Sequence, residues 1–150
     1  MKRHSRYVMI LGLTLLGCSS LKNGDEKKSS VILYKISGMP VRALNYKPNT
    51  QYIDDYEVLN TYAVGDNASV GLNKILSADS LTIKDIHRSC DFFPAYALKW
   101  VSGKVILISL LPCAKIQRIN KPADGLLAVD DIKPHSQLEN WVLKVASATK

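Results

Sequence analysis

The chain of 150 residues is poor in the residue types that carry most enzymatic and metal chemistry. It has three histidines and three cysteines, and none falls into a His-Glu-x-x-His or Cys-x-x-Cys spacing. It also lacks a glycine-rich phosphate loop and a nucleophile elbow. Asp85, His87, Ser89 and Cys90 lie close together in the sequence, but neighbours in sequence do not make a catalytic triad. We therefore expect a protein that is not an enzyme and that uses no cofactor and no metal.

The apolar run near the start, residues 7–16, is uncharged but only ten residues long. A helix needs about 20 apolar residues to cross a hydrocarbon core, so this run fits the apolar region of a secretory signal instead. The positive charges of Lys2, Arg3 and Arg6 precede it. The residues that follow, Leu15-Leu16-Gly17-Cys18, resemble the bacterial lipobox.

The lipobox resemblance implies that residues 1–17 are a signal peptide and that Cys18 carries a diacylglycerol and an N-acyl chain such as palmitate. The protein would then be a lipoprotein held at the membrane, and residues 18–30, polar after the cysteine, would be a flexible tether. By the sorting rule of enteric bacteria, Asp at the position after the lipidated cysteine is a retention signal. This chain has Ser19 at that position, which implies a location on the periplasmic side of the outer membrane. An ordinary signal peptide with an incidental cysteine, or a buried core helix, are the alternatives.

Charge gives no sign of a nucleic-acid partner. Removal of the signal would leave 150 − 17 = 133 residues and reduce the net charge from +7 to +7 − 3 = +4. No stripe of Lys and Arg interleaved with aromatic residues is present, so we expect no nucleic acid among the partners. The acidic pairs Asp54-Asp55 and Asp130-Asp131 lack the alternation of a calcium loop, and we interpret them as solvated turn residues.

Residues 31–150 are expected to form a single α+β domain, a small antiparallel sheet with two helices. Strands are predicted at residues 31–36, 56–64, 115–119 and 126–129, and a short run at 41–46 follows the first strand. Residues 95–101 and 104–111 predict a hairpin around Ser102-Gly103, with the second strand in a central position. One helix is predicted from Asn67, as its cap, to about residue 78. The C-terminal helix, predicted to cover the sheet, begins with the capping box Ser136 to Glu139.

Cys90 and Cys113 remain once Cys18 is assigned to the lipid, and an even pair in an oxidising compartment favours a disulfide. In a hairpin with a two-residue turn at Ser102-Gly103, the residue numbers of two facing positions add up to 205. The residue numbers of the two cysteines add up to 203, two less than this value. They therefore fall at the same end of the hairpin, which predicts a disulfide that staples it. Two buried free thiols or a metal pair are the alternatives.

The segment from Cys90 through Phe92, Phe93 and Pro94 to Cys113 resembles small immunity lipoproteins that protect the periplasm against type VI effectors. Many of these have Cys-aromatic-x-Pro-Arg-His at the start and Cys-x-x-Cys at the end. Here Ala95-Tyr96 replaces Arg-His, and a single cysteine closes the segment. The resemblance implies a protein partner, a toxic effector such as a phospholipase or a peptidoglycan hydrolase.

Three tyrosines around the loop at Pro48, namely Tyr46, Tyr52 and Tyr56, are candidate partner-binding residues because tyrosine is common at interface hot spots. The alternative for each is an ordinary half-buried tyrosine of a strand. A second hypothesis for the whole protein is an accessory lipoprotein of an envelope secretion or surface assembly, which would use the same anchor, tether and small domain.

Overall fold

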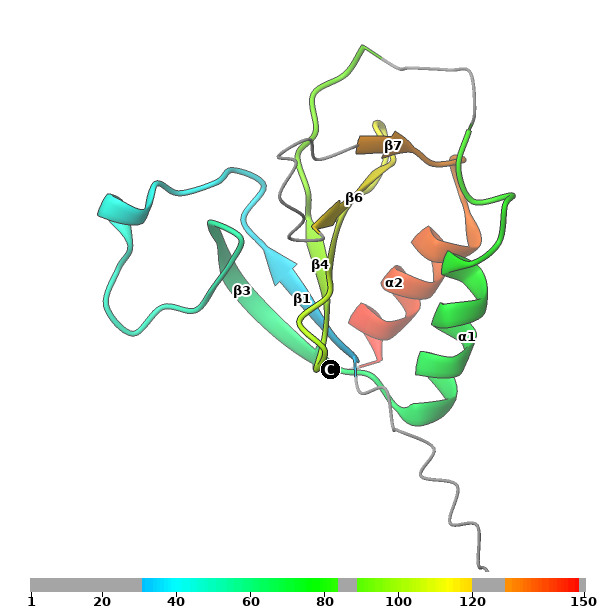
Figure 1. The fold of residues 1–150 in the computed structure, drawn as a ribbon, viewed down its shortest axis with the longest axis horizontal. Coiled ribbons are helices and arrows are strands. Elements are labelled where there is room, and N and C mark those ends of the chain that lie inside the picture. Colours follow the sequence, from blue (N-terminus) through cyan, green and yellow to red (C-terminus); the bar gives the residue numbers. More distant parts are fainter. Residues whose placement is uncertain (1–30, 84–88, 120–128, 149–150) are drawn as a thin grey trace, which may run out of the picture.

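The structure, a computed structural model, describes residues 31–83, 89–119 and 129–148 and has an α+β fold (Figure 1). In chain order the elements are β1 (Val31–Ile36), the 3₁₀ turn η1 (Ala43–Asn45), β2 (Tyr52–Ile53), β3 (Tyr56–Ala63), α1 (Asp66–Leu76), β4 (Tyr96–Trp100), β5 (Val105–Ser109), β6 (Lys115–Ile119), β7 (Val129–Asp131) and α2 (Gln137–Ser147).

The strands form one curled antiparallel sheet in the order β2-β3-β1-β4-β5-β6-β7. The strands predicted at residues 31–36, 56–64 and 115–119 are confirmed. All residues of β5 are buried, since this strand lies inside the sheet and both of its faces are covered. The missing polar alternation in residues 104–111 had predicted this central position.

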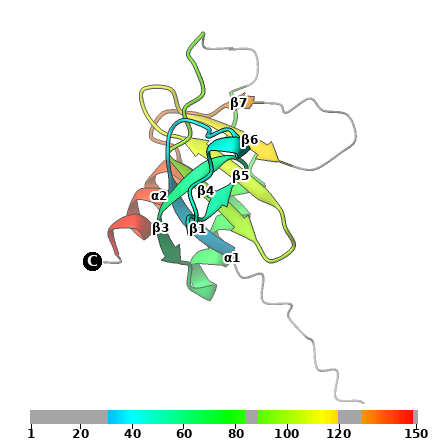
Figure 2. The ribbon, with the colours of Figure 1, turned by 90° about the vertical axis from the view of Figure 1, so that its left-hand side faces the viewer.

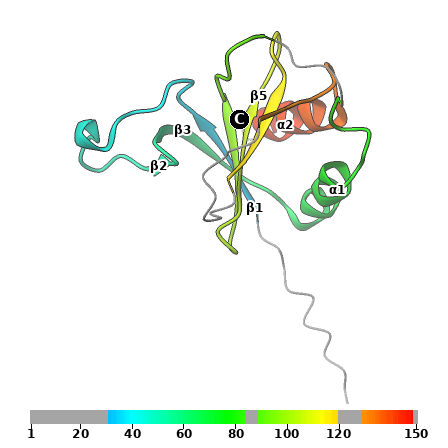
Figure 3. The same ribbon diagram turned by 45° about the horizontal axis from the view of Figure 1, so that its top comes forward.

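Both helices cover one face of the sheet (Figure 3) and enclose the larger core. Leu138 and Val142 of α2 are 0% exposed, with Trp141 and Val145 packed beside them, so the apolar stripe of this helix faces the sheet. The indole Nε1 of Trp141 donates a hydrogen bond of 3.2 Å to the backbone oxygen of Ala68 in α1. This contact joins the two helices, and the prediction that the C-terminal helix covers the sheet is confirmed.

A second, smaller core lies on the opposite face of the sheet. Successive side chains of a strand point to opposite faces, so Ala97 and Leu107 face away from the helices while Leu98 and Ile106 face toward them. The buried members of the second core are Tyr34, Ile36, Ile53, Tyr56, Ala97, Val105 and Leu107. No helix of the described chain covers this face, which the curl of the sheet and β2 partly enclose.

The predicted hairpin is confirmed, but its predicted register is wrong by one residue. Lys99 faces Val105, so facing positions add up to 99 + 105 = 204. Gly103 has a φ of +86°, and its N–H bonds to the oxygen of Trp100 while the N–H of Trp100 bonds to the oxygen of Lys104. The loop therefore has three residues with glycine in the left-handed position, and not the two assumed from Ser102-Gly103.

The Cys90–Cys113 disulfide is confirmed, with 6.3 Å between the two Cα atoms. In the observed register the two positions differ from a facing pair by one residue, so the bridge closes the end of the hairpin as expected. Polar contacts surround it. Ser109 Oγ donates to the oxygen of Cys113 at 2.8 Å, and Lys115 Nζ donates to the oxygen of Cys90 at 2.9 Å.

Both helices are confirmed, with differences at their N-termini. The α2 cap is present, because Ser136 Oγ accepts from the N–H of Glu139 at 3.2 Å. The Glu139 carboxylate bonds to the N–H of His135 at 2.7 Å and not to that of Ser136, so the capping box reaches one residue further back. Helix α1 has Gly65 as its N-cap, and the prediction of Asn67 as the cap is wrong. Asp66 lies in the first turn, where its negative charge interacts favourably with the positive end of the helix dipole.

Two further predictions need correction. The run at 41–46 forms no strand, because Ala43–Asn45 makes a 3₁₀ turn. Asp130 and Asp131 are not turn residues but part of β7, where Asp131 is 5% exposed. Of the strand predicted at 126–129, only Val129 lies within the described residues. The predicted signal peptide, Cys18 and the tether also lie outside them. Within residues 31–83, 89–119 and 129–148, none of the helices could cross a bilayer.

Candidate partner-binding site

A projecting arm, residues 37–55, connects β1 to β3 and extends from the sheet on the side away from the helices (Figures 1 and 3). It returns to the sheet through a two-residue hairpin in which Ile53 faces Tyr56. Asp54 and Asp55 both have positive φ values, 47° and 69°, as a turn of type I′ requires. Aspartate tolerates this conformation better than most residues, so the sequence Asp54-Asp55 suits the turn.

Two of the candidate tyrosines brace the arm from within. The rings of Tyr46 and Tyr52 are stacked, with centroids 3.9 Å apart and planes inclined by 6°. The Tyr46 hydroxyl donates to the Asp55 carboxylate, and the N–H of Lys47 donates to the Tyr52 hydroxyl at 2.9 Å. The hydrogen bond to Asp55, with smaller contributions from desolvation and nearby charge, raises the pKa of Tyr46 to about 12. The two ends of the loop around Pro48 are thereby joined.

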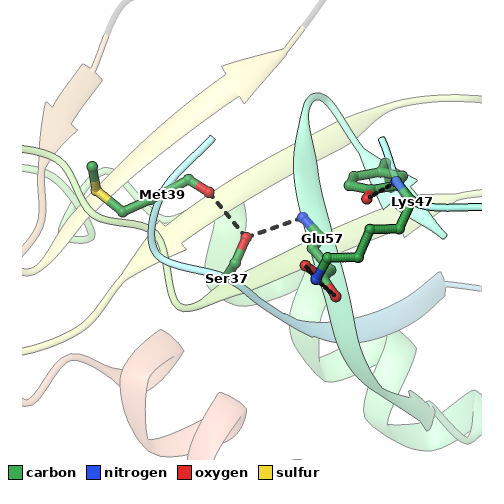
Figure 4. A network of polar contacts seen from close by, with 5 residues as sticks. Ser37, Met39, Lys47 and Glu57 are labelled. Carbon is green, nitrogen blue, oxygen red and sulfur yellow. Dashed lines mark hydrogen bonds and ion pairs between the residues drawn. The ribbon is translucent and has the colours of Figure 1, made fainter. Parts of the chain in front are cut away.

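Polar contacts also fix the base of the arm to β3 (Figure 4). Ser37 Oγ donates to the oxygen of Met39 and accepts from the N–H of Glu57, both at 3.0 Å. Lys47 Nζ lies 3.2 Å from the Glu57 carboxylate. The N–H of Val41 bonds to the oxygen of Asp55 at 2.7 Å. The arm is therefore held at its base and along its length, and its shape is preorganised.

The arm presents apolar side chains to solvent. Leu44 in η1 is 97% exposed, the largest exposure among the large hydrophobic residues of the described chain, and Met39 is 62% exposed. Phe93, which is 51% exposed, lies beside the base of the arm, because a methyl group built on Gly38 would be 3.9 Å from its Cβ. Contiguous exposed apolar patches are typical of protein-binding surfaces, and these side chains lie on one projecting segment and at its base.

A groove of about 760 Å³ lies at the foot of the arm, between β2 and the β4–β5 hairpin. Ile53, Val105 and Ile119 supply its apolar lining. Lys99 and Lys104 line it too, and Lys104 Nζ lies 4.9 Å from the centroid of a Trp100 ring. The groove therefore adds a concave, partly basic surface next to the convex arm.

The structure places two of the three predicted tyrosines in this site. Tyr46 and Tyr52 lie in the arm, and Tyr46 is 38% exposed. Tyr56 is 9% exposed and packs in the second core, where burial raises its pKa, so it offers little surface to a partner. Leu44 and Met39 were missed in the sequence, because an apolar residue in a short run is usually buried. The adjacent Pro40 and Pro48, which disfavour a strand, were the available signal.

Within the described residues, no group of three or more His, Cys, Asp and Glu side chains is placed to hold a metal ion. The sequence cluster from Asp85 to Cys90 cannot be placed as a whole, since residues 84–88 lie outside the described ranges. Comparison with models of known families, with curated proteins and with solved structures finds no match.

Proposed function

We propose that this chain is a lipid-anchored immunity protein that faces the periplasm from the outer membrane and neutralises a toxic effector, such as a type VI phospholipase or a peptidoglycan hydrolase. The observation that supports the proposal is the preorganised arm with Leu44, 97% exposed, on its 3₁₀ turn. An inhibitor needs a surface that fits the cleft of its target, and it needs no catalytic groups of its own. A braced convex segment with an apolar end suits that task.

Energetics favour such an arm as the inhibitory element. The stacked Tyr46 and Tyr52 and the hydrogen bonds at the base order the segment before binding, so less conformational entropy is lost in the complex. Full burial of a leucine side chain is worth about 1.5–3 kcal/mol. At about 1.4 kcal/mol for each factor of ten, Leu44 alone can supply roughly 10- to 100-fold in affinity.

The lipid anchor would place this arm where an incoming effector arrives. From Cys18 to Val31 the chain advances 31 − 18 = 13 residues, which reach roughly 45 Å when fully extended. A domain on such a tether searches a thin layer next to the membrane, and its effective concentration there is much higher than that of a freely diffusing protein. The proposed anchor and the proposed partner are therefore consistent with each other.

The decisive experiment compares Leu44→Asp with Val70→Asp in the full chain. Val70 is 72% exposed on α1, on the opposite side of the sheet from the arm, and it serves as the matched control. If the adjacent gene encodes a lipase or a peptidoglycan hydrolase, cells in which that enzyme is directed to the periplasm should survive with the wild-type chain and with Val70→Asp. They should not survive with Leu44→Asp, whose affinity for the purified enzyme should fall at least about tenfold.

Two results would contradict the proposal. Leu44→Asp could protect as well as Val70→Asp although both variants reach the membrane in equal amounts. A strain that lacks the gene could show a secretion or envelope defect when grown alone, without any toxin-delivering neighbour. That second result would favour an accessory lipoprotein of an envelope assembly.

A further inference from the structure

One side of β3 is open along the C-terminal half of the strand. β2 pairs with Tyr56 and Glu57 only, and Gln51 accepts one further bond from the N–H of Val58. β1 occupies the inner side of β3 as far as Ala63. Within the described part of the chain, no strand pairs with the outer side of residues 59–63. Figure 2 looks onto this side of the molecule.

The backbone of this segment directs hydrogen-bonding groups outward. The N–H of Thr61 bonds to the side-chain oxygen of Asn60 at 2.8 Å and not to β1. In an antiparallel ladder the N–H groups of successive residues point to opposite sides, so the N–H of Ala63, two residues after Thr61, also points to the outer side. The Asn60 side chain thus occupies a donor that a neighbouring strand would otherwise use.

The other end of the sheet is covered by a further segment, whereas no segment among residues 31–83, 89–119 and 129–148 pairs with this edge beyond Val58. Next to β7, Thr82 forms a bridge with Ile132, and the N–H of Ile83 bonds to the oxygen of Asp131 at 2.9 Å. The β3 segment 58–63, Val-Leu-Asn-Thr-Tyr-Ala, contains no charge and no proline. Charged residues, proline and covering segments are the usual devices that keep an edge from pairing. Residues 58–63 contain neither charge nor proline, and no segment of the described chain covers the outer side of 59–63. An extended, uncharged strand is the partner that fits.

We propose that two copies of this chain pair through their β3 edges, antiparallel and with two-fold symmetry about Thr61. In this register Thr61 faces its counterpart, Asn60 faces Tyr62, and Leu59 faces Ala63 of the second copy. All facing pairs are neutral, and a Thr–Thr pair is favourable across strands. Leu59, which is 56% exposed, and the exposed Ala63 would cover each other at both ends of the paired segment.

The register is self-complementary, which is what a two-fold interface between identical chains requires. The edge is too short to bury the roughly 1,000 Å² typical of a stable dimer, so we expect weak association that needs high protein concentration. Covalent capture is therefore a better test than size measurement in dilute solution.

The test uses the full chain purified in mild detergent, with Thr61→Cys and, as the control, Val70→Cys, both oxidised over a series of concentrations. Facing Cα atoms of an antiparallel pair lie about 4.5–5.5 Å apart, within the range that a disulfide bridges. Non-reducing gels should show a covalent dimer for Thr61→Cys only. Both proteins carry the same native cysteines, so any cross-linking by these appears equally in the control.

Two second changes in the Thr61→Cys chain test the register itself. Asn60→Ala removes the side-chain oxygen that competes for the N–H of residue 61. Cross-linking should then be about fivefold faster, which corresponds to the net contribution of one hydrogen bond. Leu59→Lys puts a charge at the edge and should suppress cross-linking, whereas Val70→Lys should leave it unchanged. Circular dichroism and thermal melting establish beforehand that each variant is folded.

Three outcomes would overturn the proposal. Thr61→Cys could cross-link no faster than Val70→Cys, or Leu59→Lys could have no effect on the rate. In cell envelopes Thr61→Cys could instead be captured on a different protein with no dimer formed, which would assign the edge to a heterologous partner.

Discussion

Lys115 on β6 and Asp131 on β7 face each other and form a buried ion pair. The Nζ to Oδ1 distance is 3.8 Å, and the two side chains are 11% and 3% exposed. The same ammonium group donates to the backbone oxygen of Cys90 at 2.9 Å. Lys115 therefore joins three segments that are distant in sequence, and we expect Lys115→Met to be strongly destabilising.

The magnitude follows from burial. Lys115→Met removes the cation beside a carboxylate that is 3% exposed, and breaking a buried pair in this way typically costs about 3–5 kcal/mol. For a domain whose total stability is about 5–15 kcal/mol, this is about a fifth or more of the free energy of unfolding. In Lys115→Met/Asp131→Leu both charges are gone, and apolar side chains often replace a buried pair at little cost. The double variant should therefore be at least about 2 kcal/mol more stable than Lys115→Met.

Urea denaturation of the wild type, the two single variants and the double variant measures this coupling. The neighbouring pair Arg118–Asp130 joins the same two strands but is 36% and 37% exposed, so it is the matched control. Arg118→Met should cost less than about 1 kcal/mol. Equal losses for Lys115→Met and Arg118→Met, or strictly additive losses in the double variant, would refute the reasoning.

Three further outcomes are expected. Replacing both Cys90 and Cys113 by serine should lower the free energy of unfolding by about 3 kcal/mol, and an unchanged thermal midpoint would contradict this. The pKa of Tyr46 is raised to about 12 from the usual 10.0, so its hydrogen bond to Asp55 stabilises the fold fully below pH 10 and is lost as the pH rises through 12. Asp55→Asn should move the pKa of Tyr46, measured by ultraviolet titration, back toward 10.0. If Tyr46 had the same pKa in the variant as in the wild type, Asp55 would be excluded as the cause. Cys18→Ala should abolish metabolic labelling with a fatty acid, and undiminished label would disprove the lipoprotein hypothesis.

Local patterns in the sequence were sufficient for the longer strands and both helices of this domain, but not for β2, the 3₁₀ turn or most of β7. Strand composition at residues 31–36 and 56–64 and the unbroken apolar run of β5 predicted the sheet and its central strand. The apolar spacing that follows Ser136 predicted α2 and its buried face, because a period of 3.6 residues has one structural meaning. The Cys90–Cys113 bridge followed from the hairpin that brings its two ends together.

Everything that depends on which surface is left uncovered was decided by the tertiary structure. The left-handed Gly103 made the hairpin loop one residue longer than assumed, and this changed the register of the whole ladder. Leu44 and Tyr56 lie in the same region of the sequence, yet the first is exposed and the second is buried. Tyr56 packs in the second core, whereas Leu44 lies in the projecting arm. Contacts between segments that are distant in sequence decide which side chains are exposed, bring Lys115 opposite Asp131 and leave the edge of β3 open. Local composition does not determine those contacts.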